Sequence, residues 1–254
     1  THAETGTKAA LAIMTTDSVP KEAEVRADGW VVGGMAKGAG MVRPDMATML
    51  AFLTTDAVVG PDELRTALRV AVDASFNSLN IDGCESTNDT VIVMASGGSG
   101  ISPDPEAFTE ALTAVCRDLA LNMARDAEGA SRVVTIGLSG AASDAEARRL
   151  GRVITDSALV RSSFYGGDVN WGRIVGALGS TESGIDFEDI AVSYDEVVVF
   201  EGGEGTDFDE EALLDRYATG DMNLTVSVGS GSGTATIVTT DLTPEYVIFN
   251  GERS

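Results

Sequence analysis

Thr48 stands where a residue could act as an N-terminal nucleophile. A glycine-rich turn follows Lys37 and bends at Pro44, and the apolar run Met49–Leu53 after it is typical of a buried strand. This pattern suits a chain that cleaves itself between Ala47 and Thr48. The freed α-amine, with a reference pKa of about 7.7–8.0, then serves as base for the hydroxyl of the same residue. The alternative is a glycine-rich hairpin whose threonine merely begins a strand.

The scarcity of other reactive side chains favours an amine base. His2 is the only histidine, which nearly excludes a Ser-His-Asp triad, a Cys-His pair or a histidine-rich metal site. Cys84 and Cys116 lie far apart without metal-ligand spacing, and we interpret both as buried thiols rather than a disulfide. The glycine-rich stretch 97–100 lacks the Lys-Ser/Thr ending of a phosphate-binding loop. We therefore expect no metal and no cofactor.

The charge balance is strongly acidic. The 254 residues carry a net charge of −23, and the only lysines are Lys8, Lys21 and Lys37. Such an acid excess indicates adaptation to high salt, where screening makes dense like charge tolerable. The alternative is an acidic cytosolic protein without salt adaptation. Either way, a basic groove for nucleic acid is excluded. No apolar run is long enough to cross a membrane and no signal peptide is visible, so we expect a cytoplasmic protein.

Alternating short strands and amphipathic helices surround Thr48. Apolar spacing predicts helices beginning at Pro61 and near Ser143, with a third over 105–125. Short apolar runs predict strands, at 30–34, 49–53, 91–94, 133–138, 196–200, 223–228, 234–238 and 246–249. A short acidic helix is expected over 208–216. This order, without a βαβ dinucleotide fingerprint, indicates an α+β fold.

Five segments carry a family resemblance that spans nearly the whole chain. They are Met-Thr-Thr-Asp at 14–17, Lys-Gly-Ala-Gly-Met at 37–41 with its Ala-Thr-Met-Leu junction, Ser-Thr-Asn-Asp-Thr at 86–90, Ala-Glu-Gly-Ala at 127–130 and Asp-Val-Asn-Trp-Gly-Arg at 168–173. In order and spacing, these resemble the signatures of the self-cleaving glutamate N-acetyltransferase (ornithine acetyltransferase) family. The resemblance implies a layered αββα sandwich of the N-terminal-nucleophile kind with a smaller C-terminal α/β lobe.

The predicted cleavage point and the order of strands and helices together predict three parts of the chain. Residues 1–47 would end the segment before cleavage, 48–180 would form the core that begins with the nucleophile, and 181–254 would form the C-terminal lobe. Family members carry a substantial further segment before the region that matches here. We expect the cleaved segments to remain together as a heterodimer and to assemble into a higher oligomer.

The resemblance also assigns substrate contacts. Besides Thr48, they fall on Thr15, Lys37, Glu128, Asn250 and Ser254. The Lys37 amine suits a substrate carboxylate and the Glu128 carboxylate suits an ammonium, while the other three supply hydrogen bonds. The alternatives are a solvent lysine and a helix-end surface acid. The tail after Asn250 is one residue shorter than the family pattern and lacks its aromatic residue.

Two further features bear on the site. Asn170, Trp171 and Arg173 form a polar-aromatic cluster that we interpret as a structural corner rather than a wall of the site. The family stabilises its oxyanion with an upstream Thr-Gly pair, and Thr5-Gly6 lies too close to the run at 14–17 to be that pair. Loss of an oxyanion donor costs on the order of a hundredfold or more in rate. We therefore expect this chain alone to have a strongly reduced catalytic rate.

The function implied is acetyl transfer from N-acetylornithine to glutamate through an acetyl-Thr48 ester. The products are ornithine and N-acetylglutamate, and the resemblance also allows acetyl-CoA as donor. One alternative is an N-terminal-nucleophile aminopeptidase or amidohydrolase, in which water takes the acyl group. Another is a non-catalytic acidic scaffold protein that retains the fold.

Overall fold

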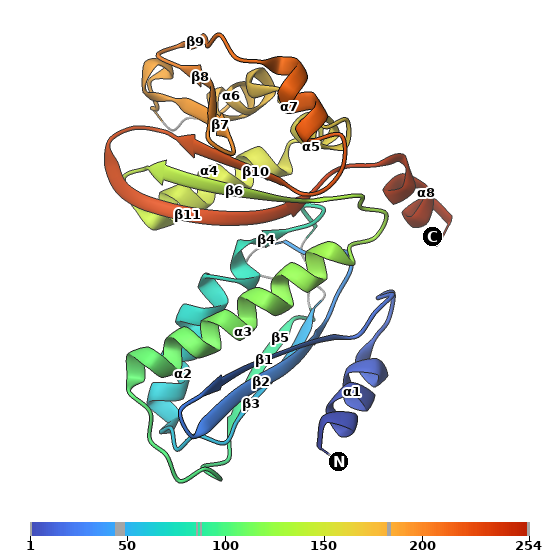
Figure 1. Ribbon diagram of the computed structural model, residues 1–254, viewed down its shortest axis with the longest axis vertical. Helices are drawn as coiled ribbons and strands as arrows, with labels where there is room; N and C mark the ends of the chain where they lie inside the picture. Colours follow the sequence, from blue (N-terminus) through green and yellow to red (C-terminus); the bar gives the residue numbers. More distant parts are fainter. Residues whose placement is uncertain (1, 44–48, 85, 87, 182–183, 253–254) are drawn as a thin grey trace. The chain divides into compact units, whose positions relative to one another are not determined.

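The chain forms two compact units, residues 1–128 and 129–254, in a computed structural model (Figure 1). The structure describes residues 2–43, 49–84, 86, 88–181 and 184–252. Within these ranges, none of the helices has the length and apolar character needed to cross a membrane.

The first unit is built on a four-stranded sheet. Its strands, in spatial order, are β1 (Lys21–Ala27), β2 (Trp30–Lys37), β3 (Leu50–Thr55) and β5 (Thr90–Ala95). β1, β2 and β3 pair antiparallel, whereas β3 and β5 run parallel with Leu50 opposite Thr90. Because Lys37 lies opposite Leu50, the glycine-rich turn leaves and re-enters the sheet at one end. This register brings the end of β2 and the starts of β3 and β5 to the same end of the sheet.

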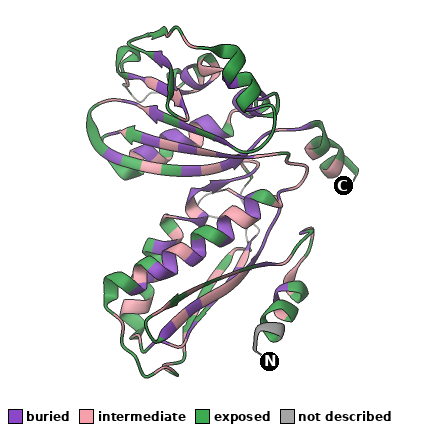
Figure 2. Cartoon of the chain, in the orientation of Figure 1, coloured by how far each residue is buried: buried purple, intermediate pink, exposed green. Residues whose placement is uncertain are grey.

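Helices α2 (Pro61–Asp73) and α3 (Pro105–Arg125) pack together, and α3 covers one face of the sheet along β1 and β2. α3 begins where the Asp104 carboxylate accepts hydrogen bonds from the N–H groups of Glu106 and Ala107. Its buried stripe faces the sheet (Figure 2). A short 3₁₀ turn and the two-residue strand β4 (Leu79–Asn80) follow α2.

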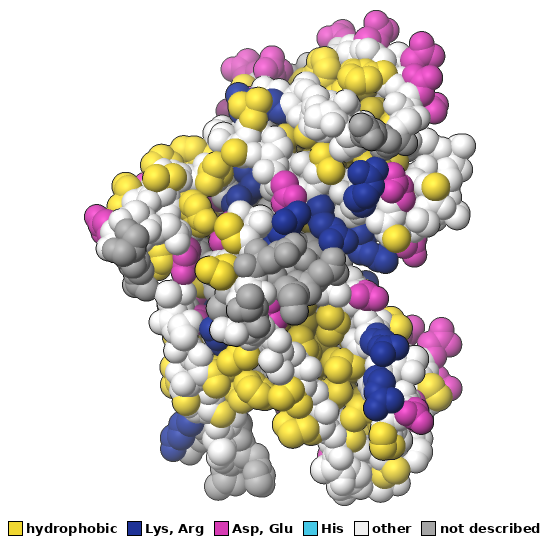
Figure 3. Space-filling model, turned by 180° about the vertical axis from the view of Figure 1, so that it is seen from behind, with side chains coloured by type: hydrophobic (Ala, Val, Ile, Leu, Met, Phe, Trp, Pro, Cys, Tyr) yellow, Lys and Arg dark blue, Asp and Glu magenta, His cyan; other side chains and the backbone are white. Residues whose placement is uncertain are grey.

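The opposite face of the sheet is only partly covered. Helix α1 (His2–Ile13) contacts β1 and β2 there, and a groove of about 720 Å³ lies between this helix and the sheet. Met35, Phe52 and Met94 line the groove, and Met94 is half exposed. Hydrophobic side chains gather on this unit in the lower half of Figure 3. An apolar sheet face of this kind is typical of a surface on which a further layer packs.

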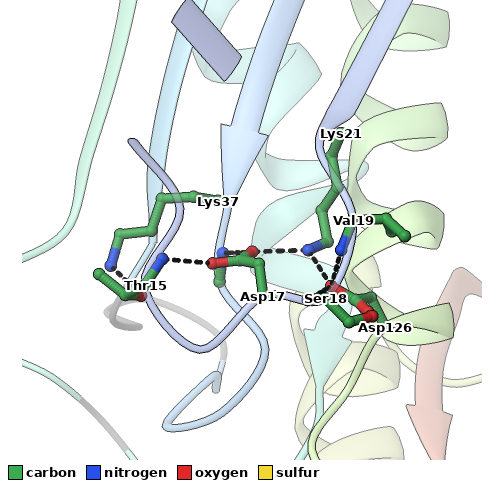
Figure 4. A network of polar contacts seen from close by, with 8 residues as sticks. Thr15, Asp17, Ser18, Val19, Lys21, Lys37 and Asp126 are labelled. Atoms are coloured by element: carbon green, nitrogen blue, oxygen red, sulfur yellow. Dashed lines mark hydrogen bonds and ion pairs between the residues drawn. The ribbon is translucent and has the colours of Figure 1, made fainter. Parts of the chain in front are cut away.

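A buried lysine ties the first strand to the end of α3. Lys21, at the start of β1, is 1% exposed. Its Nζ lies 2.6 Å from a carboxylate oxygen of Asp17 and 2.6 Å from one of Asp126 (Figure 4). The Asp126 carboxylate also accepts hydrogen bonds from the N–H groups of Ser18 and Val19. We call Asp17, Lys21 and Asp126 the buried ion triad.

The second unit contains the other sheet. Its strands pair in the order β11, β6, β10, β7, β8 and β9, and their bounds are β6 (Val133–Gly140), β7 (Ala191–Tyr194), β8 (Val197–Glu201), β9 (Glu204–Gly205), β10 (Met222–Ser227) and β11 (Gly231–Thr240). β6 and β10 are parallel, and the other neighbouring pairs are antiparallel.

Helices complete the core of the second unit. They are α4 (Asp144–Asp156), α5 (Ala158–Tyr165), α6 (Trp171–Gly179), α7 (Glu210–Arg216) and α8 (Pro244–Glu252). α4 lies on β11 and β6, and Ser143 caps it as expected by accepting a hydrogen bond from the Glu146 N–H. One cluster of buried residues includes side chains of α4, α5, α6 and every strand from β6 to β11 except β9.

The cluster at 168–173 makes structural contacts. The Asn170 side chain accepts the Arg173 N–H and donates to Asp168, Arg173 donates to the Leu159 carbonyl, and Trp171 stacks on an aromatic ring of β8. The Asn170 side chain caps the N-terminus of α6, and the other contacts hold α6 against α5 and β8. They agree with the interpretation of a structural corner.

The expected α+β class is confirmed, but the units differ from the expected lobes. They are nearly equal in length, and they divide between Glu128 and Gly129. The boundary expected near residue 180 falls inside the second unit. Leu178 on α6 and Val192 on β7 belong to the same buried cluster, so the core is continuous across that point.

Two local expectations are wrong. The strand expected over 246–249 is part of helix α8, because Thr243 accepts the Tyr246 N–H at its start and Pro244 stands at its first position. Cys84 is exposed rather than buried, because it lies in a loop, whereas Cys116 is buried in α3. Both thiols are free, as expected.

We predict that Lys21→Met destabilises the protein by about 3–5 kcal/mol, because it leaves two buried carboxylates without their cation. Urea unfolding of the full-length protein measures this as a lower midpoint. Arg65→Met is the matched control, since Arg65 makes an exposed ion pair with Asp62 that contributes little. Equal midpoints for both variants would contradict a stabilising role of the buried ion triad.

We also predict that the stability difference between the native protein and Asp17→Asn shrinks in acid. Burial alone would raise the pKa of Asp17, but hydrogen bonds from the Gly38 N–H, Lys21 and the Thr15 N–H lower it below its ordinary value. A lowered folded-state pKa contributes stability that is present above about pH 3.8 and lost as the pH falls through the folded value. Unfolding of both proteins from pH 7 to pH 2 tests this, and a constant difference would argue against it.

Candidate active site

Three of the expected site residues lie at one end of the sheet in the first unit. Lys37 ends β2 and is 7% exposed, Thr15 lies in the segment before β1, and Glu128 follows the end of α3. Thr48 and Ala47, the expected cleavage junction, and Ser254 lie outside the described residues. The junction is nevertheless bracketed in the chain by the described residues Arg43 and Met49.

Asp17 joins Thr15 to the turn that follows Lys37 (Figure 4). One carboxylate oxygen accepts the Gly38 N–H at 2.8 Å as well as the Lys21 ammonium, and the other accepts the Thr15 N–H at 3.1 Å. The Lys37 Nζ lies 3.4 Å from the Thr15 Oγ1. The buried ion triad therefore fixes the backbone on both sides of the Thr15–Lys37 contact.

Glu128 rests against the glycine-rich turn. Its N–H donates to the Ala39 carbonyl at 2.8 Å. A Cβ added at Gly40 would lie 2.5 Å from one Glu128 carboxylate oxygen and 2.7 Å from its Cδ. The carboxylate thus occupies the space that any other residue at position 40 would fill. The turn holds a buried ammonium group at position 37 and a carboxylate against position 40.

Asp82 anchors the next part of the turn. Its carboxylate accepts the Met41 N–H at 2.6 Å and the Val42 N–H at 3.1 Å. Met41 has a left-handed backbone conformation with φ of 54°, which is uncommon for a residue with a side chain. The two hydrogen bonds hold this conformation two residues before Arg43, the last described residue before the junction.

Asp89 anchors the chain on the other side of the junction. Its Oδ1 accepts the Met49 N–H at 2.7 Å. Burial raises the pKa of Asp89, and the Met49 hydrogen bond and the Lys37 charge only partly oppose the shift. A carboxylate with this desolvation lies directly beside the residue that follows Thr48.

Asn250 lies in the second unit, on α8, where it is exposed and its Nδ2 donates to the Tyr246 carbonyl. Its expected substrate contact stays a prediction. Among other nucleophiles, Cys116 is unsuited to attack, because burial raises the pKa of its thiol to about 12. In the described ranges, no His, Cys, Asp and Glu side chains form a group of three that could hold a metal ion.

Sequence reasoning assigned no role to the three carboxylates that anchor the turn. Asp17 and Asp89 lie in two of the signature runs, and Asp82 precedes the second of them. The sequence did contain an indication of this role, since an aspartate near a glycine-rich turn can accept hydrogen bonds from the backbone N–H groups of the turn. Which acid reaches which N–H follows only from the sheet and its loops.

Chemically, the arrangement suits a small zwitterion. A buried ammonium group before the turn and a partly buried carboxylate packed against it complement a carboxylate and an ammonium on a ligand. The turn leads directly into the segment that carries Thr48.

Comparison with known proteins bears on the identity of the chain. The family model described as "ArgJ family" matches residues 1–254. The protein named arginine biosynthesis bifunctional protein ArgJ is 46% identical over 98% of this chain in Thermobifida fusca, and 43% identical over 98% in Streptomyces coelicolor. The matches cover 64% of each relative, so the chain spans less than two-thirds of the length of these curated relatives.

A solved structure agrees with this assignment. The crystal structure of arginine biosynthesis bifunctional protein ArgJ from Bacillus halodurans superposes with a TM-score of 0.75 at 35% sequence identity, covering 78% of this chain and 96% of that one. The match of fold, the sequence identity and the family model over every residue lead to one conclusion. The chain belongs to the ArgJ family.

Proposed function

We propose that the protein containing this chain is a glutamate N-acetyltransferase of arginine biosynthesis. It moves an acetyl group from N-acetylornithine to glutamate, and acetyl-CoA can serve as a second donor. The observation that carries the proposal is the pair of opposite charges at the glycine-rich turn: Lys37 directly precedes the turn, and Glu128 packs against its Gly40. The turn leads along the chain to Thr48. The name of the relatives, which refers to arginine biosynthesis and to two functions, supports the substrate class.

The proposed mechanism is acyl transfer in two half-reactions. Cleavage between Ala47 and Thr48 frees an α-amine, which takes the proton of the Thr48 hydroxyl as its Oγ attacks the acetyl carbonyl. The C–N bond of N-acetylornithine breaks, the proton passes to the leaving amine, and ornithine departs from an acetyl-Thr48 ester. The amine of glutamate then attacks the ester and regenerates the hydroxyl.

The same binding residues serve both half-reactions, because donor and acceptor share an α-amino-acid framework. Lys37 pairs with the α-carboxylate of either substrate, and Glu128 receives the side-chain ammonium of ornithine. Thr15 adds a hydrogen bond, and Asn250 and Ser254 complete the proposed contacts. Burial of Lys37 strengthens its attraction for a carboxylate relative to an exposed lysine.

We propose that the cleaved segments stay associated as a heterodimer within a higher oligomer in the cytoplasm. The apolar face of the four-stranded sheet supports this assembly, because Ile92 and Met94 expose 39% and 50% of their surface there. The net charge of −23 supports function at high salt, where screening weakens self-repulsion.

Two other functions make different predictions. An aminopeptidase or amidohydrolase with the same nucleophile releases its acyl group to water, so product formation is independent of glutamate. A scaffold protein keeps the bond before Thr48 intact and forms no acetyl-enzyme.

We predict that protein expressed from the whole reading frame yields a fragment beginning at Thr48, and that Thr48→Ala stays uncut and transfers no acetyl group. Intact mass under denaturing conditions detects the fragment and the acetyl-enzyme formed with N-acetylornithine. Thr54→Ala, at an exposed position of β3, is the control and should be cut normally. An uncut native protein that still transfers acetyl groups would refute the N-terminal nucleophile, and acetate release unaffected by glutamate would identify a hydrolase.

We also predict that Gly40→Ala raises the KM for N-acetylornithine by on the order of tenfold or more with little change in stability. The new methyl group would displace the Glu128 carboxylate, the mobile end of its side chain, and a hydrogen bond to a charged group contributes about 1.5–3 kcal/mol. Steady-state kinetics and thermal unfolding measure the two effects.

Gly60→Ala is the matched control, because a Cβ at Gly60 meets no atom within 4 Å. This variant should keep the native KM. An unchanged KM in Gly40→Ala would argue against an ammonium contact by Glu128, whereas a large loss of stability would show that the backbone, not the carboxylate, had moved.

A further inference from the structure

Asp126 joins the segments of two proposed substrate contacts. It lies directly after α3 and two residues before Glu128. Its carboxylate accepts hydrogen bonds from the Ser18 N–H at 2.9 Å, from the Ser18 hydroxyl and from the Lys21 ammonium at 2.6 Å (Figure 4). Ser18 stands three residues after Thr15. One carboxylate therefore fixes the segment of Thr15 against the segment of Glu128.

A second carboxylate joins Thr15 to Lys37. Asp17 accepts the Thr15 N–H at 3.1 Å and, at 2.8 Å, the N–H of Gly38, the residue after Lys37. The Lys37 Nζ itself lies 3.4 Å from the Thr15 Oγ1. The backbones that carry these two side chains are thus held together through Asp17.

The glycine-rich turn closes this set of contacts into a ring. The Glu128 N–H donates to the Ala39 carbonyl at 2.8 Å. Three segments are thereby hydrogen-bonded in pairs, each to the other two, and we call them the recognition ring: 15–18, 37–39 and 126–128. The Lys21 ammonium binds both carboxylates of the ring at 2.6 Å. The ring therefore contains Thr15, Lys37 and Glu128, the three described contacts of the first unit.

We propose that Asp126 is a positioning residue that sets the side-chain length of the substrate. This inference rests on the proposed function, in which Lys37 pairs with the α-carboxylate and Glu128 with the side-chain ammonium of ornithine. The ring holds the backbone of both residues, so the span between their charges suits one number of methylene groups. Asp126 fixes the Glu128 end of this span.

The burial of the ring's charged groups supports a rigid span. The side chains of Asp17, Lys21 and Asp126 are 1%, 0% and 7% exposed. Buried groups held by packing and by hydrogen bonds keep the residues beside them in a defined geometry. In such a site, one methylene group more or less changes kcat/KM by about 10- to 200-fold. A Glu128 carboxylate that can shift would follow a longer side chain, and the discrimination would be lost.

The test compares the full-length native protein with Asp126→Asn, with glutamate as acceptor. The acetyl donors are N-acetylornithine and α-N-acetyllysine, whose side chain is longer by one methylene group. Asparagine keeps an acceptor for the Ser18 N–H but removes the charge that binds Lys21. The preference for N-acetylornithine, as a ratio of kcat/KM values, should fall by on the order of tenfold. The kcat/KM for glutamate should change little, because glutamate has no side-chain ammonium for Glu128 to receive.

The ratio between the two donors separates positioning from a merely structural role. A loss of folded protein lowers the activity with both donors equally and leaves their ratio unchanged. Asp56→Asn is the matched control, because Asp56 accepts the Val31 N–H at 2.8 Å at the other end of β2 from Lys37. This variant should keep the native ratio.

Ser18→Ala is the second test variant. It removes only the hydroxyl that donates to Asp126 and leaves the charges of the buried ion triad in place. The preference for N-acetylornithine should fall in this variant as well, by less than in Asp126→Asn, because the Ser18 N–H still binds the carboxylate. It decides the question if Asp126→Asn does not fold.

The outcomes separate this inference from the proposed function. If the native protein transfers no acetyl group from either donor, the proposed function fails and the inference falls with it. If the native protein is active but shows no preference between the donors, or if folded Asp126→Asn keeps the native preference, the positioning role of Asp126 fails alone. It also fails if Asp56→Asn loses the preference equally, or if Ser18→Ala keeps it when Asp126→Asn does not fold.

Discussion

The buried charge of Lys21 is the constraint on which the first unit depends. An ammonium group that is 1% exposed is tolerated only with anionic partners, and Asp17 and Asp126 each approach it to 2.6 Å. These partners come from the segment before β1 and from the residue after α3. Satisfying one cation therefore fixes the entry of the chain, the first strand and the end of the long helix relative to one another.

Carboxylates also fix the backbone of the glycine-rich turn. A turn has few backbone partners of its own, so its N–H groups need acceptors from elsewhere. Asp17 accepts from Gly38, Asp82 accepts from Met41 and Val42, and Asp89 accepts from Met49. These acids bracket the junction on both sides. In a chain with a net charge of −23, these carboxylates have defined structural partners rather than adding only to the surface charge.

The glycine-rich turn connects the proposed recognition residue Lys37 to the proposed nucleophile along the chain. Its first residues follow Lys37, and the Glu128 carboxylate packs against Gly40, so both members of the proposed charge pair lie at the turn. Its far end returns to the sheet at Met49. The proposed binding residue Lys37 and the proposed nucleophile Thr48 are therefore linked through one short chain segment.

The sequence by itself determined the α+β class, most of the strands and helices, and the residue types of the site, because apolar periodicity, capping and spacing are local properties. It also predicted α3 with its observed bounds. Only the tertiary structure decided that the units divide after Glu128 and that Asp82 and Asp89 hold the turn. Those outcomes depend on the parallel register of β3 and β5 and on a core shared across residue 180, which are contacts between residues far apart in the chain.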